Sequence, residues 1–455
     1  MSNVSVIILA AGQGSRMKSA LPKVLHPIAG KALVQHVIDT SYQLNAKKII
    51  GVYGHGGDIV PKTINDNNVT WVAQAEQLGT GHAVDQAMPE VSDADIALVL
   101  YGDVPLTKTD TLVQLIAMAE NDFALLTVHL DDPSGYGRIV RNAHGIVERI
   151  VEHKDSSDEE KLISEINTGI LAVNAGKLRA WLKQLDNSNA QGEYYLTDII
   201  AMAVADGMTV KTVNPETEEE VLGVNSRTQL AELEGFYQLN NAQSLMEQGV
   251  TIIDPTRLDI RGNVTVGKDV TLDINVILEG DVTIGDNVSI GANCVVKDSV
   301  IERGVVMQPM CCVEQAHIGA DSKVGPFARI RPGTKLAEQT HIGNFVEIKN
   351  SNVNKGSKIN HLSYIGDTDM GAGVNIGAGT ITCNYDGANK HRTEIGDNVF
   401  VGSSTQLIAP LKVGDGATIG AGSTITKDTP ENELTLTRAK QTSIKGWQRP
   451  TKDKK

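Results

Sequence analysis

The stretch IGDNVSIGANCVV, residues 284–296, places an aliphatic side chain at every sixth position, at Ile284, Ile290 and Val296. The residue four places after each aliphatic is usually small or branched, as Val288 is. In an extended chain, positions i and i+4 point to the same side. Each hexapeptide therefore offers two inward side chains, followed by a turn that glycine eases. Repeats of this kind predict a parallel β-helix.

The same six-residue period runs through most of the C-terminal half. It starts at Ile260, resumes at Ile318 and near Ile359 after short slips, and ends at Ile425. The alternative is chance spacing of aliphatic residues in an ordinary β-rich domain, and the number of repeats argues against it. We therefore assign residues 250–455 to a repeat domain with a C-terminal tail, whose last few residues we expect to be disordered.

The N-terminal half has a different pattern, in which strand-like runs alternate with helical ones. The runs rich in branched aliphatic residues are Val4–Ala11, Ile49–Tyr53, Ile96–Tyr101, Ala124–Leu130 and Ile166–Val173. Helical patterns at 33–44 and 110–119 lie between them. This alternation predicts an α/β domain, Rossmann-like with a largely parallel sheet, over residues 1–225. The pattern of residues 226–249 predicts one linker helix.

Length and charge narrow the possible functions. The 455 residues allow two or three domains. The formal net charge of −14 argues against a nucleic-acid partner, because no basic stripe is available to neutralise phosphates. The four cysteines show no metal-binding spacing, so we expect buried thiols in a reducing compartment. No signal peptide precedes the first strand and no apolar run approaches membrane-spanning length, so we expect a cytoplasmic protein without a membrane partner.

A glycine-rich loop, Gly12–Gln13–Gly14–Ser15–Arg16, follows the first predicted strand. Glycines let backbone N–H groups approach a phosphate chain closely, and Arg16 and Lys23 add positive charge. The loop lacks the third glycine of GxGxxG and the Gly-Lys-Ser/Thr of a Walker loop, so it predicts a nucleotide site of another kind. Asp103 follows a predicted strand at the sheet edge where α/β proteins bind ligands, although a simple turn residue before Val104 is the alternative.

A second candidate site lies on the repeats, two places after the inward aliphatic residue. The residues at this position are His361, Ala378, Ser403 and Ala421. With three repeats to a coil they stack on successive coils, and the small ones leave room for a long, thin ligand. Arg331 and Lys349 should stack in the same way, to bind a sugar phosphate or simply as surface cations. A loop at 383–390 interrupts the repeat, and loops on a rigid scaffold concentrate function.

Short motifs along the N-terminal half closely resemble those of the sugar-phosphate nucleotidylyltransferases. They are Leu9–Gly14 with Arg16, Leu21–Lys23, Gln74, Leu78–Gly81, Tyr101–Asp103, Gly135–Arg138, Glu152 and Asn167–Gly169. The repeat half resembles the hexapeptide-repeat acyltransferases, which are left-handed triangular prisms and usually trimers. Essentially the whole chain resembles the family of bifunctional N-acetylglucosamine-1-phosphate uridylyltransferases and glucosamine-1-phosphate N-acetyltransferases, which make UDP-N-acetylglucosamine for bacterial cell-envelope polymers. Ser15 departs from the pattern, because the family often has Thr there.

The resemblance implies that the N-terminal half transfers UMP from UTP to N-acetylglucosamine-1-phosphate and releases pyrophosphate. Arg16 and Lys23 would be catalytic, because two anions must meet and their charge must be neutralised. Asp103 would hold Mg²⁺ with Asn225, which the sequence alone favours as a plain helix cap. Gln74, Gly79 and Thr80 would read the uracil, while Gly137, Glu152 and Asn167 would hold the sugar. The full set implied for the UDP-sugar is Leu9, Ala10, Ala11, Gly12, Lys23, Gln74, Gly79, Thr80, Tyr101, Gly102, Asp103, Gly137, Glu152, Asn167 and Asn225.

For the C-terminal half, the resemblance implies that acetyl-CoA acetylates glucosamine-1-phosphate, ahead of uridylyl transfer. His361 would be the general base that takes a proton from the attacking amine. Glucosamine-1-phosphate would bind Arg331, Lys349, Tyr364 and Asn375. Acetyl-CoA would contact Ala378, Asn384, Tyr385, Ser403, Ala421 and Arg438. A neighbouring chain of a homotrimer would supply the other wall of this site, because one convex edge cannot enclose a substrate.

Two other functions are compatible with the same folds. One is a nucleotidylyltransferase whose β-helix only regulates or oligomerises it, and the set of His361, Arg331 and Lys349 argues against this. The other is a non-enzymatic scaffold, and the intact glycine-rich loop with Lys23 and Asp103 argues against that. Turnover of UTP and of acetyl-CoA would distinguish the three.

Overall fold

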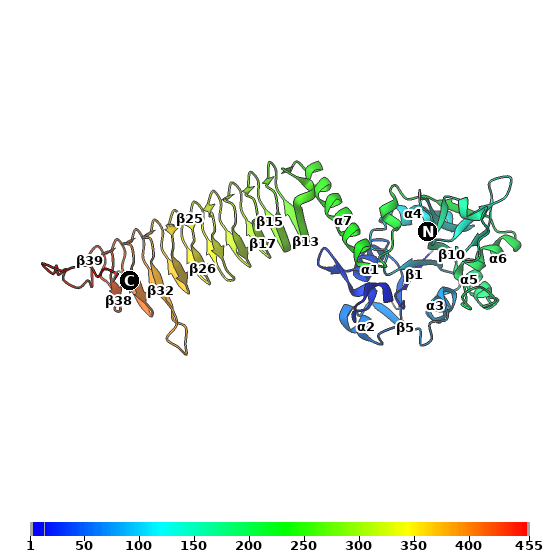
Figure 1. Cartoon of the computed structure of the whole chain (residues 1–455), viewed down its shortest axis with the longest axis horizontal. Coiled ribbons are helices and arrows are strands. Elements are labelled where there is room, and N and C mark those ends of the chain that lie inside the picture. The colour runs from blue at the N-terminus through cyan, green and yellow to red at the C-terminus, as the bar shows by residue number, and fades with distance from the viewer. Residues whose placement is uncertain (1–2, 13, 453–455) are drawn as a thin grey trace. The chain divides into compact units, whose positions relative to one another are not determined.

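The chain forms two compact units, residues 1–237 and 238–455. The computed structural model describes residues 3–12 and 14–452, so Gln13 of the glycine-rich loop and the last three residues of the basic tail lie outside the described residues. Figure 1 shows an α/β unit in the N-terminal half and a long stack of short strands in the C-terminal half. In the described part of the chain, no helix is long and apolar enough to cross a membrane.

The N-terminal unit is built on one nine-stranded sheet. Its main path runs β11 (Val210–Val213), β7 (Phe123–His129), β10 (Glu165–Asn174), β6 (Ile96–Tyr101), β1 (Val4–Leu9), β4 (Lys48–Tyr53) and β5 (Val69–Ala73). The strands β8 (Arg138–Arg141) and β9 (Val147–Val151) extend it from β10. Neighbours on this path are parallel except β10, which is antiparallel to both β6 and β7. The predicted largely parallel sheet is confirmed, with β10 as a reversed strand inside it.

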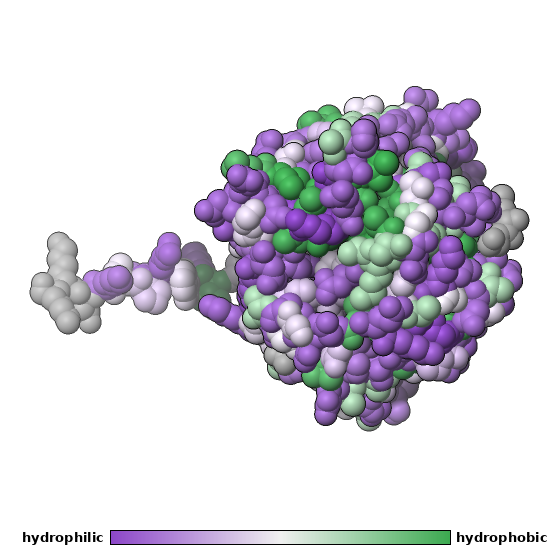
Figure 2. Space-filling view, turned by 90° about the vertical axis from the view of Figure 1, so that its right-hand side faces the viewer, coloured by the Kyte–Doolittle hydropathy of each residue, from purple (hydrophilic) through white to green (hydrophobic). Residues whose placement is uncertain are grey.

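Helices cover both faces of this sheet, which explains why its central strands are apolar on both sides. Val6 and Ile8 of β1 pack with α1 (Leu33–Gln43) and α4 (Thr109–Met118). Ile7 and Leu9 point the other way and pack with α3 (Thr80–Ala87), α5 (Ala175–Leu182) and α6 (Ile199–Ala205). The short α2 (Ile59–Ile64) follows β4. On the face of this unit shown in Figure 2, hydrophilic side chains dominate and apolar ones gather in a band across the middle.

The predicted linker helix is α7 (Arg227–Glu247), and its two halves belong to different units. Ser226 caps it, because the Ser226 Oγ accepts a hydrogen bond from the Gln229 N–H at 3.2 Å. Leu233 is buried in a cluster of the N-terminal unit. In the C-terminal unit, Gln238 exchanges two hydrogen bonds with the backbone of Ile260, at 2.8 and 2.9 Å. Each half of α7 is therefore anchored to the unit in which it lies.

The C-terminal unit is a parallel β-helix, as the repeat predicts. One coil contains β28 (Lys358–His361), β29 (Tyr364–Gly366) and β30 (Thr368–Met370), and β31 (Asn375–Ile376) begins the next coil. All strand pairs between coils are parallel and continue through eleven strands on one sheet and seventeen on the other. Each of the three corners of this coil has one residue with positive φ, namely Leu362, Asp367 and Gly373, at 48°, 49° and 67°.

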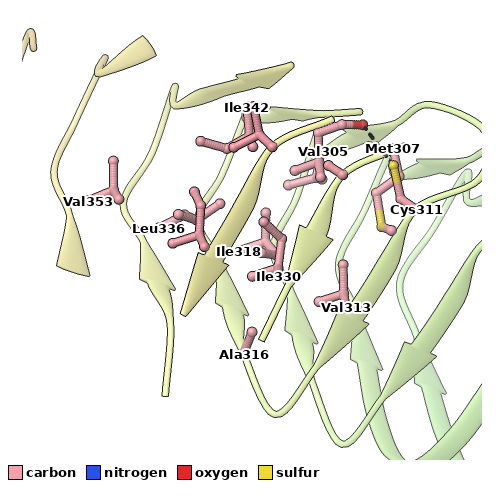
Figure 3. Close-up of a cluster of buried hydrophobic side chains, with 14 of the residues drawn as sticks. Val305, Met307, Cys311, Val313, Ala316, Ile318, Ile330, Leu336, Ile342 and Val353 are labelled. Atoms are coloured by element: carbon pink, nitrogen blue, oxygen red, sulfur yellow. Dashed lines mark hydrogen bonds between the residues drawn. The ribbon is translucent and has the colours of Figure 1, made fainter. Parts of the chain in front are cut away.

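The interior of the β-helix is filled by the residues that the six-residue period marks. Ile284, Ile290 and Val296 of the opening stretch are 1% exposed or less, as are the intervening Val288 and Cys294. Figure 3 shows such side chains from successive coils stacked upon one another inside the prism. At the first coils Val266 is only partly buried, although it lies on the period. Apart from such positions, the inward residues of the β-helix form one continuous hydrophobic cluster.

Candidate active sites

A cavity of about 560 Å³ opens in the N-terminal unit beside the carboxyl ends of β1 and β6. The sequence-predicted residues that line it are Leu9, Ala10, Ala11, Gly12, Lys23, Gln74, Gly79, Thr80, Tyr101 and Asp103. Four further lining residues were not predicted, namely Val24, Gln77, Ala83 and Glu193. The structure therefore brings together residues that lie far apart in the sequence, at the sheet edge where α/β proteins bind ligands.

Lys23 connects the glycine-rich region to the two residues predicted as metal ligands. Its ammonium group donates to Asp103 Oδ2 and, at 3.0 Å, to Asn225 Oδ1. The side chains of Lys23 and Asp103 are only 13% and 14% exposed. The backbone also joins these segments, since the Val224 N–H donates to the Asp103 carbonyl at 2.9 Å. Asn225 therefore does more than precede a helix: its amide oxygen faces the same point as the Asp103 carboxylate, and Ser226 serves as the cap.

Gly14 lets this cluster form. Its φ is +60°, and a Cβ on Gly14 would lie only 2.7 Å from the Lys23 Cβ. Arg16 is exposed on the 3-10 turn Ser15–Met17 and does not line the cavity. The charges of Arg16 and Asp103 both act on Tyr136. Burial and the Asp103 charge raise the Tyr136 pKa, while the Arg16 charge lowers it. The predicted cations thus occupy different positions, with Lys23 inside the cavity and Arg16 outside its lining.

The predicted sugar-binding residues Gly137, Glu152 and Asn167 lie near one another, and Asn167 lines a second, smaller hollow. The Asn167 N–H donates to the Gly137 carbonyl at 2.8 Å, and Thr197 donates to Glu152 Oε1 at 3.1 Å. A Cβ on Gly137 would approach Glu152 Oε1 to 3.6 Å. Burial, more than the neighbouring carboxylates, raises the pKa of Glu152.

Tyr101 joins the hollow to the cavity, since it lines both. Burial and the charges of Asp103 and Glu152 raise its pKa. Gly102 lines neither the cavity nor the smaller hollow. Its N–H donates to the Leu9 carbonyl at 2.9 Å within the sheet.

The arrangement of oxygens at Lys23 fits a divalent cation. No group of three or more His, Cys, Asp and Glu side chains in the described residues could hold a metal ion. Magnesium, however, needs only one or two protein oxygens when substrate phosphates complete its coordination. Asp103 Oδ2 and Asn225 Oδ1 converge on one positive group, the Lys23 ammonium. One carboxylate and one amide oxygen beside a cavity are suitable donors for a divalent cation such as Mg²⁺.

A column of residues along one corner of the β-helix contains His361. In register on successive coils lie Asn344, His361, Ala378, Ser403 and Ala421, which we call the histidine edge. Backbone hydrogen bonds continue the stacking, since the N–H groups of Gly379, Ser404 and Gly422 donate to the carbonyls of His361, Ala378 and Ser403 at 3.2, 2.7 and 2.8 Å. The predicted stacking of His361 with the three small residues is therefore present in the structure.

Asn344 contacts the histidine ring directly and was not predicted. His361 Nδ1 lies 2.9 Å from Asn344 Oδ1. An amide oxygen only accepts, so the Nδ1 atom carries the proton and Nε2 keeps its lone pair. Asn344 lies seventeen positions before His361, two places after the inward Ile342. The repeat register could have identified it.

The predicted phosphate cations lie at the next corner of the coil. Arg331 and Lys349 are adjacent on neighbouring coils, since the Arg331 N–H donates to the Ile348 carbonyl at 2.8 Å. Arg331 Nη1 pairs with Glu347 Oε1 at 2.7 Å. Lys390 of the inserted loop, which was not predicted, faces Lys349 and is the main cause of a lowered Lys349 pKa. We call Arg331, Lys349 and Lys390 the cation edge.

The buried carboxylate of Asp367 organises the base of the inserted loop beside the cation edge. It accepts hydrogen bonds from the side-chain amides of Asn350 and Asn384. These bonds lower the Asp367 pKa, although burial opposes them. The predicted Tyr364 lies in the same place, because a Cβ on Gly366 would meet both its hydroxyl and the Asn384 amide. Asn384 is thereby positioned near Lys349.

The residues predicted for acetyl-CoA are divided between the two corners. Arg438 joins the histidine edge, where Cβ atoms on Gly420 and Gly422 would lie 3.7 and 3.8 Å from its side chain. Asn384 and Tyr385 belong to the inserted loop, with Tyr385 61% exposed. Asn375 lies on β31, paired with Lys358 and Phe400, on the sheet that ends at the histidine edge. No single corner of one chain holds the complete predicted set.

Comparisons with known proteins cover both units. The MobA-like NTP transferase domain matches residues 6–191. The GMPPB C-terminal domain matches residues 260–342, and the bacterial transferase hexapeptide (six repeats) matches residues 392–427. The chain is 57% identical over 453 residues to "Bifunctional protein GlmU" of Ralstonia nicotianae, and 58% identical over 453 and 452 residues to the proteins of that name from Marinobacter nauticus and Azoarcus sp.. Each alignment covers 99% of this chain and 100% of the relative.

Identity at this level over the full length shows the family, and the two folds account for its two activities. The chain therefore belongs to the GlmU family of bifunctional enzymes, with a uridylyltransferase in its N-terminal half and an acetyltransferase in its C-terminal hexapeptide half.

Proposed function

We propose that the N-terminal cavity binds UTP and N-acetylglucosamine-1-phosphate and transfers UMP between them. The observation that carries this proposal is the contact of Lys23 with both Asp103 and Asn225 at the cavity. The sugar-phosphate oxygen must attack the α-phosphorus, and both reactants are anions, so positive charge at this point stabilises the charge that develops. The Lys23 ammonium is held there by Asp103 and Asn225, the absence of a side chain at Gly14 leaves room for Lys23, and the exposed Arg16 would add to the local positive potential.

Asp103 and Asn225 would hold Mg²⁺ beside the phosphates. When bound, the ion would neutralise the phosphate charge and orient the leaving pyrophosphate. Lys23 then turns from its two present acceptors toward the phosphate oxygens. Gly12 and Gly14 keep the approach to the backbone open.

We assign the two ends of the UDP-sugar product to different groups of residues, one lining the cavity and one beside it. Gln74, Gly79 and Thr80 line the end that would receive the uracil. Glu152 and Asn167, with Gly137 leaving space beside them, would receive the N-acetyl sugar. The Thr197 hydroxyl keeps the Glu152 carboxylate in place for a sugar hydroxyl.

At the β-helix, we assign acetyl transfer to His361. The Nδ1 atom is engaged with Asn344, so Nε2 is free to take the proton that the amine of glucosamine-1-phosphate must lose as it attacks the thioester. The small side chains of Ala378, Ser403 and Ala421, with Arg438 beyond them, would accommodate acetyl-CoA along the histidine edge. Arg331, Lys349 and Lys390 would bind the sugar phosphate with Tyr364 and Asn375. Like charges held this close favour an anion between them.

A second copy of the chain is needed to complete this site, and we propose a homotrimer. His361 and the cation edge occupy successive corners, so substrates must be enclosed by corners of two chains. Four exposed apolar residues with positive φ follow one another on adjacent coils. They lie at the corner itself, each directly after a position of the histidine-edge column. They are Met310, Phe327, Phe345 and Leu362, which we call the apolar ridge. The rings of Phe327 and Phe345 stack at 5.1 Å. A partner chain that covers this ridge would approach His361.

Acetylation comes before uridylyl transfer in this proposal, because the N-terminal site would receive the N-acetyl sugar. UTP and acetyl-CoA are both intracellular metabolites, so we place the enzyme in the cytoplasm. We also propose residues 1–225 as the uridylyltransferase domain, 226–249 as the linker helix and 250–455 as the acetyltransferase domain.

Two substitutions measured on both reactions test the assignment. Asp103→Ala should abolish pyrophosphate release from UTP and leave thiol release from acetyl-CoA near wild type. His361→Ala should do the reverse, with acetyl transfer reduced by about 10²–10⁴-fold, as expected for loss of a positioned base. Asp110→Ala, a nearby exposed carboxylate, is the control for the first variant. A folded His361→Ala protein that keeps more than about a tenth of wild-type kcat would remove His361 from the base role.

A further inference from the structure

The Gln74 amide in the N-terminal cavity is held in one orientation. The side chain is 3% exposed. Its Nε2 atom donates to the Gly79 carbonyl at 3.1 Å and lies 3.1 Å from Nδ1 of His82. A carbonyl oxygen only accepts, so the nitrogen end of the amide must face Gly79. The contact with His82 then has the same nitrogen as its donor.

His82 is thereby fixed as the acceptor of this second hydrogen bond. An acceptor at Nδ1 requires that the neutral ring carries its proton on Nε2. Nε2 lies 3.3 Å from the Gln86 amide nitrogen, which only donates, so the Gln86 amide must turn its oxygen toward the ring to accept this proton. His82 lies in the first turn of α3, and its ring centroid is 6.5 Å from that of Tyr194. The Tyr194 backbone is itself bonded to Leu78 and Gly81, at 2.8 and 2.9 Å. The ring therefore has little freedom to turn away from Gln74.

The oxygen end of the amide is left for a ligand. Gln74 lines the cavity, and among the described residues none donates to Gln74 Oε1. An oxygen acceptor at this place can accept a hydrogen bond from a ring N–H of the base. The N3 atom of uracil carries a proton and the N3 atom of cytosine does not, so cytosine would set two acceptors against each other. A site built around one hydrogen bond discriminates strongly against an analogue that cannot make it.

We propose that His82 is a positioning residue that makes the uridylyltransferase prefer uracil over cytosine, by holding the Gln74 amide with its oxygen toward the base. This inference rests on the proposed function of the N-terminal cavity. Without the His82 acceptor, only the Gly79 carbonyl opposes rotation of the amide. A rotated amide would present its NH₂ group, which suits the N3 lone pair of cytosine.

Two variants of similar shape separate this role from a general effect on α3. His82→Asn keeps an acceptor near the Nδ1 position, and His82→Leu removes it. The measurement is kcat/KM for pyrophosphate release with N-acetylglucosamine-1-phosphate and either UTP or CTP. We expect His82→Leu to lower the UTP/CTP ratio of kcat/KM by at least about tenfold, the value of one hydrogen bond, while His82→Asn keeps most of the ratio. His82→Phe, which preserves a ring beside Tyr194, is the second variant if His82→Leu does not fold.

Damage to the helix alone would lower turnover of UTP and CTP together and leave their ratio unchanged. An unchanged ratio in both His82→Leu and His82→Phe would therefore overturn the positioning role, as would a His82→Asn protein no more selective than His82→Leu. Failure of the proposed function itself looks different, because the wild-type protein would then turn over neither nucleotide.

Discussion

At the scale of single residues, the uridylyltransferase site depends on how closely Gly14 approaches Lys23. Gly14→Ala would add a Cβ where only 2.7 Å separates it from the Lys23 Cβ, at a backbone angle that L side chains rarely adopt. The loop must shift, and the Lys23 ammonium must leave its position between Asp103 and Asn225. We expect uridylyl transfer to fall by about 10²-fold, the usual cost of a displacement of about 1 Å in a catalytic group.

Gly207→Ala is the matched control for this variant. Gly207 has φ +76° and no atom within 4 Å of the added Cβ. Both substitutions should cost about 1 kcal/mol of backbone strain, but only Gly14→Ala should impair the reaction. Equal pyrophosphate release by the two purified variants would show that the contact with Lys23 is not required.

The individual residues of the cavity were predicted less completely from the sequence than the strands and helices were. The resemblance to the sugar-phosphate nucleotidylyltransferases predicted ten of the residues that line the cavity. Gln77 and Glu193 reach the cavity from loops outside the quoted motifs. The role of Asn225 was ambiguous, because a helix cap and a ligand have the same residue type. Only the structure shows that Ser226 provides the cap and frees the Asn225 amide. The roles of these residues in catalysis remain predictions.

At the scale of elements, the histidine edge is a column of residues maintained by strand register, with small residues at Ala378, Ser403 and Ala421. Ser403→Leu would place a branched side chain in the column between Ala378 and Ala421. Because the side chain points outward, the interior core should be unaffected. We expect the KM for acetyl-CoA to rise at least about tenfold, with the KM for glucosamine-1-phosphate nearly unchanged.

Ala292→Leu is the control at the same corner. Ala292 lies in the column of His361, but four coils earlier along the β-helix. If Ser403→Leu and Ala292→Leu gave the same KM for acetyl-CoA, the cofactor would not lie along this edge.

The register of the β-helix explains why these elements were predictable while those of the α/β unit were less so. A six-residue period fixes which side chain lies above which, so the stacking of His361, Ala378, Ser403 and Ala421 followed from counting. Asn344 belongs to the same column and was not predicted, although counting along the repeat would have placed it there. In the α/β unit, apolar runs predicted strands such as β1 and β6. An apolar run does not show whether a strand pairs in parallel or antiparallel with its neighbours. The reversed β10 could therefore not be foreseen.

At the scale of the whole molecule, we propose that a second chain completes the acetyltransferase site, whose residues are divided between two corners of one chain. A mixture of His361→Ala and Lys349→Ala proteins should therefore regain activity after subunit exchange, since some sites would combine the intact corner of each. Random mixing in equal amounts gives roughly a quarter of the wild-type rate, because each of two corners must be intact.

A mixture of His361→Ala and Arg438→Ala is the control for this experiment. Both residues lie on the histidine edge of one chain, so no mixed site has an intact edge, and no activity should return. Recovery to the same extent in both mixtures, or in neither despite proven exchange, would contradict a site shared between the two corners.

The central claim, that one chain carries two consecutive transferase reactions, is tested most directly by the nucleotide dependence of the wild-type protein. Glucosamine-1-phosphate, UTP and Mg²⁺ are mixed with the protein, and pyrophosphate and free thiol are followed with and without acetyl-CoA. We expect almost no pyrophosphate until acetyl-CoA is added, and thereafter at least one thiol for every pyrophosphate. Pyrophosphate released at the same rate without acetyl-CoA would contradict it, since the uridylyltransferase would then accept the unacetylated sugar.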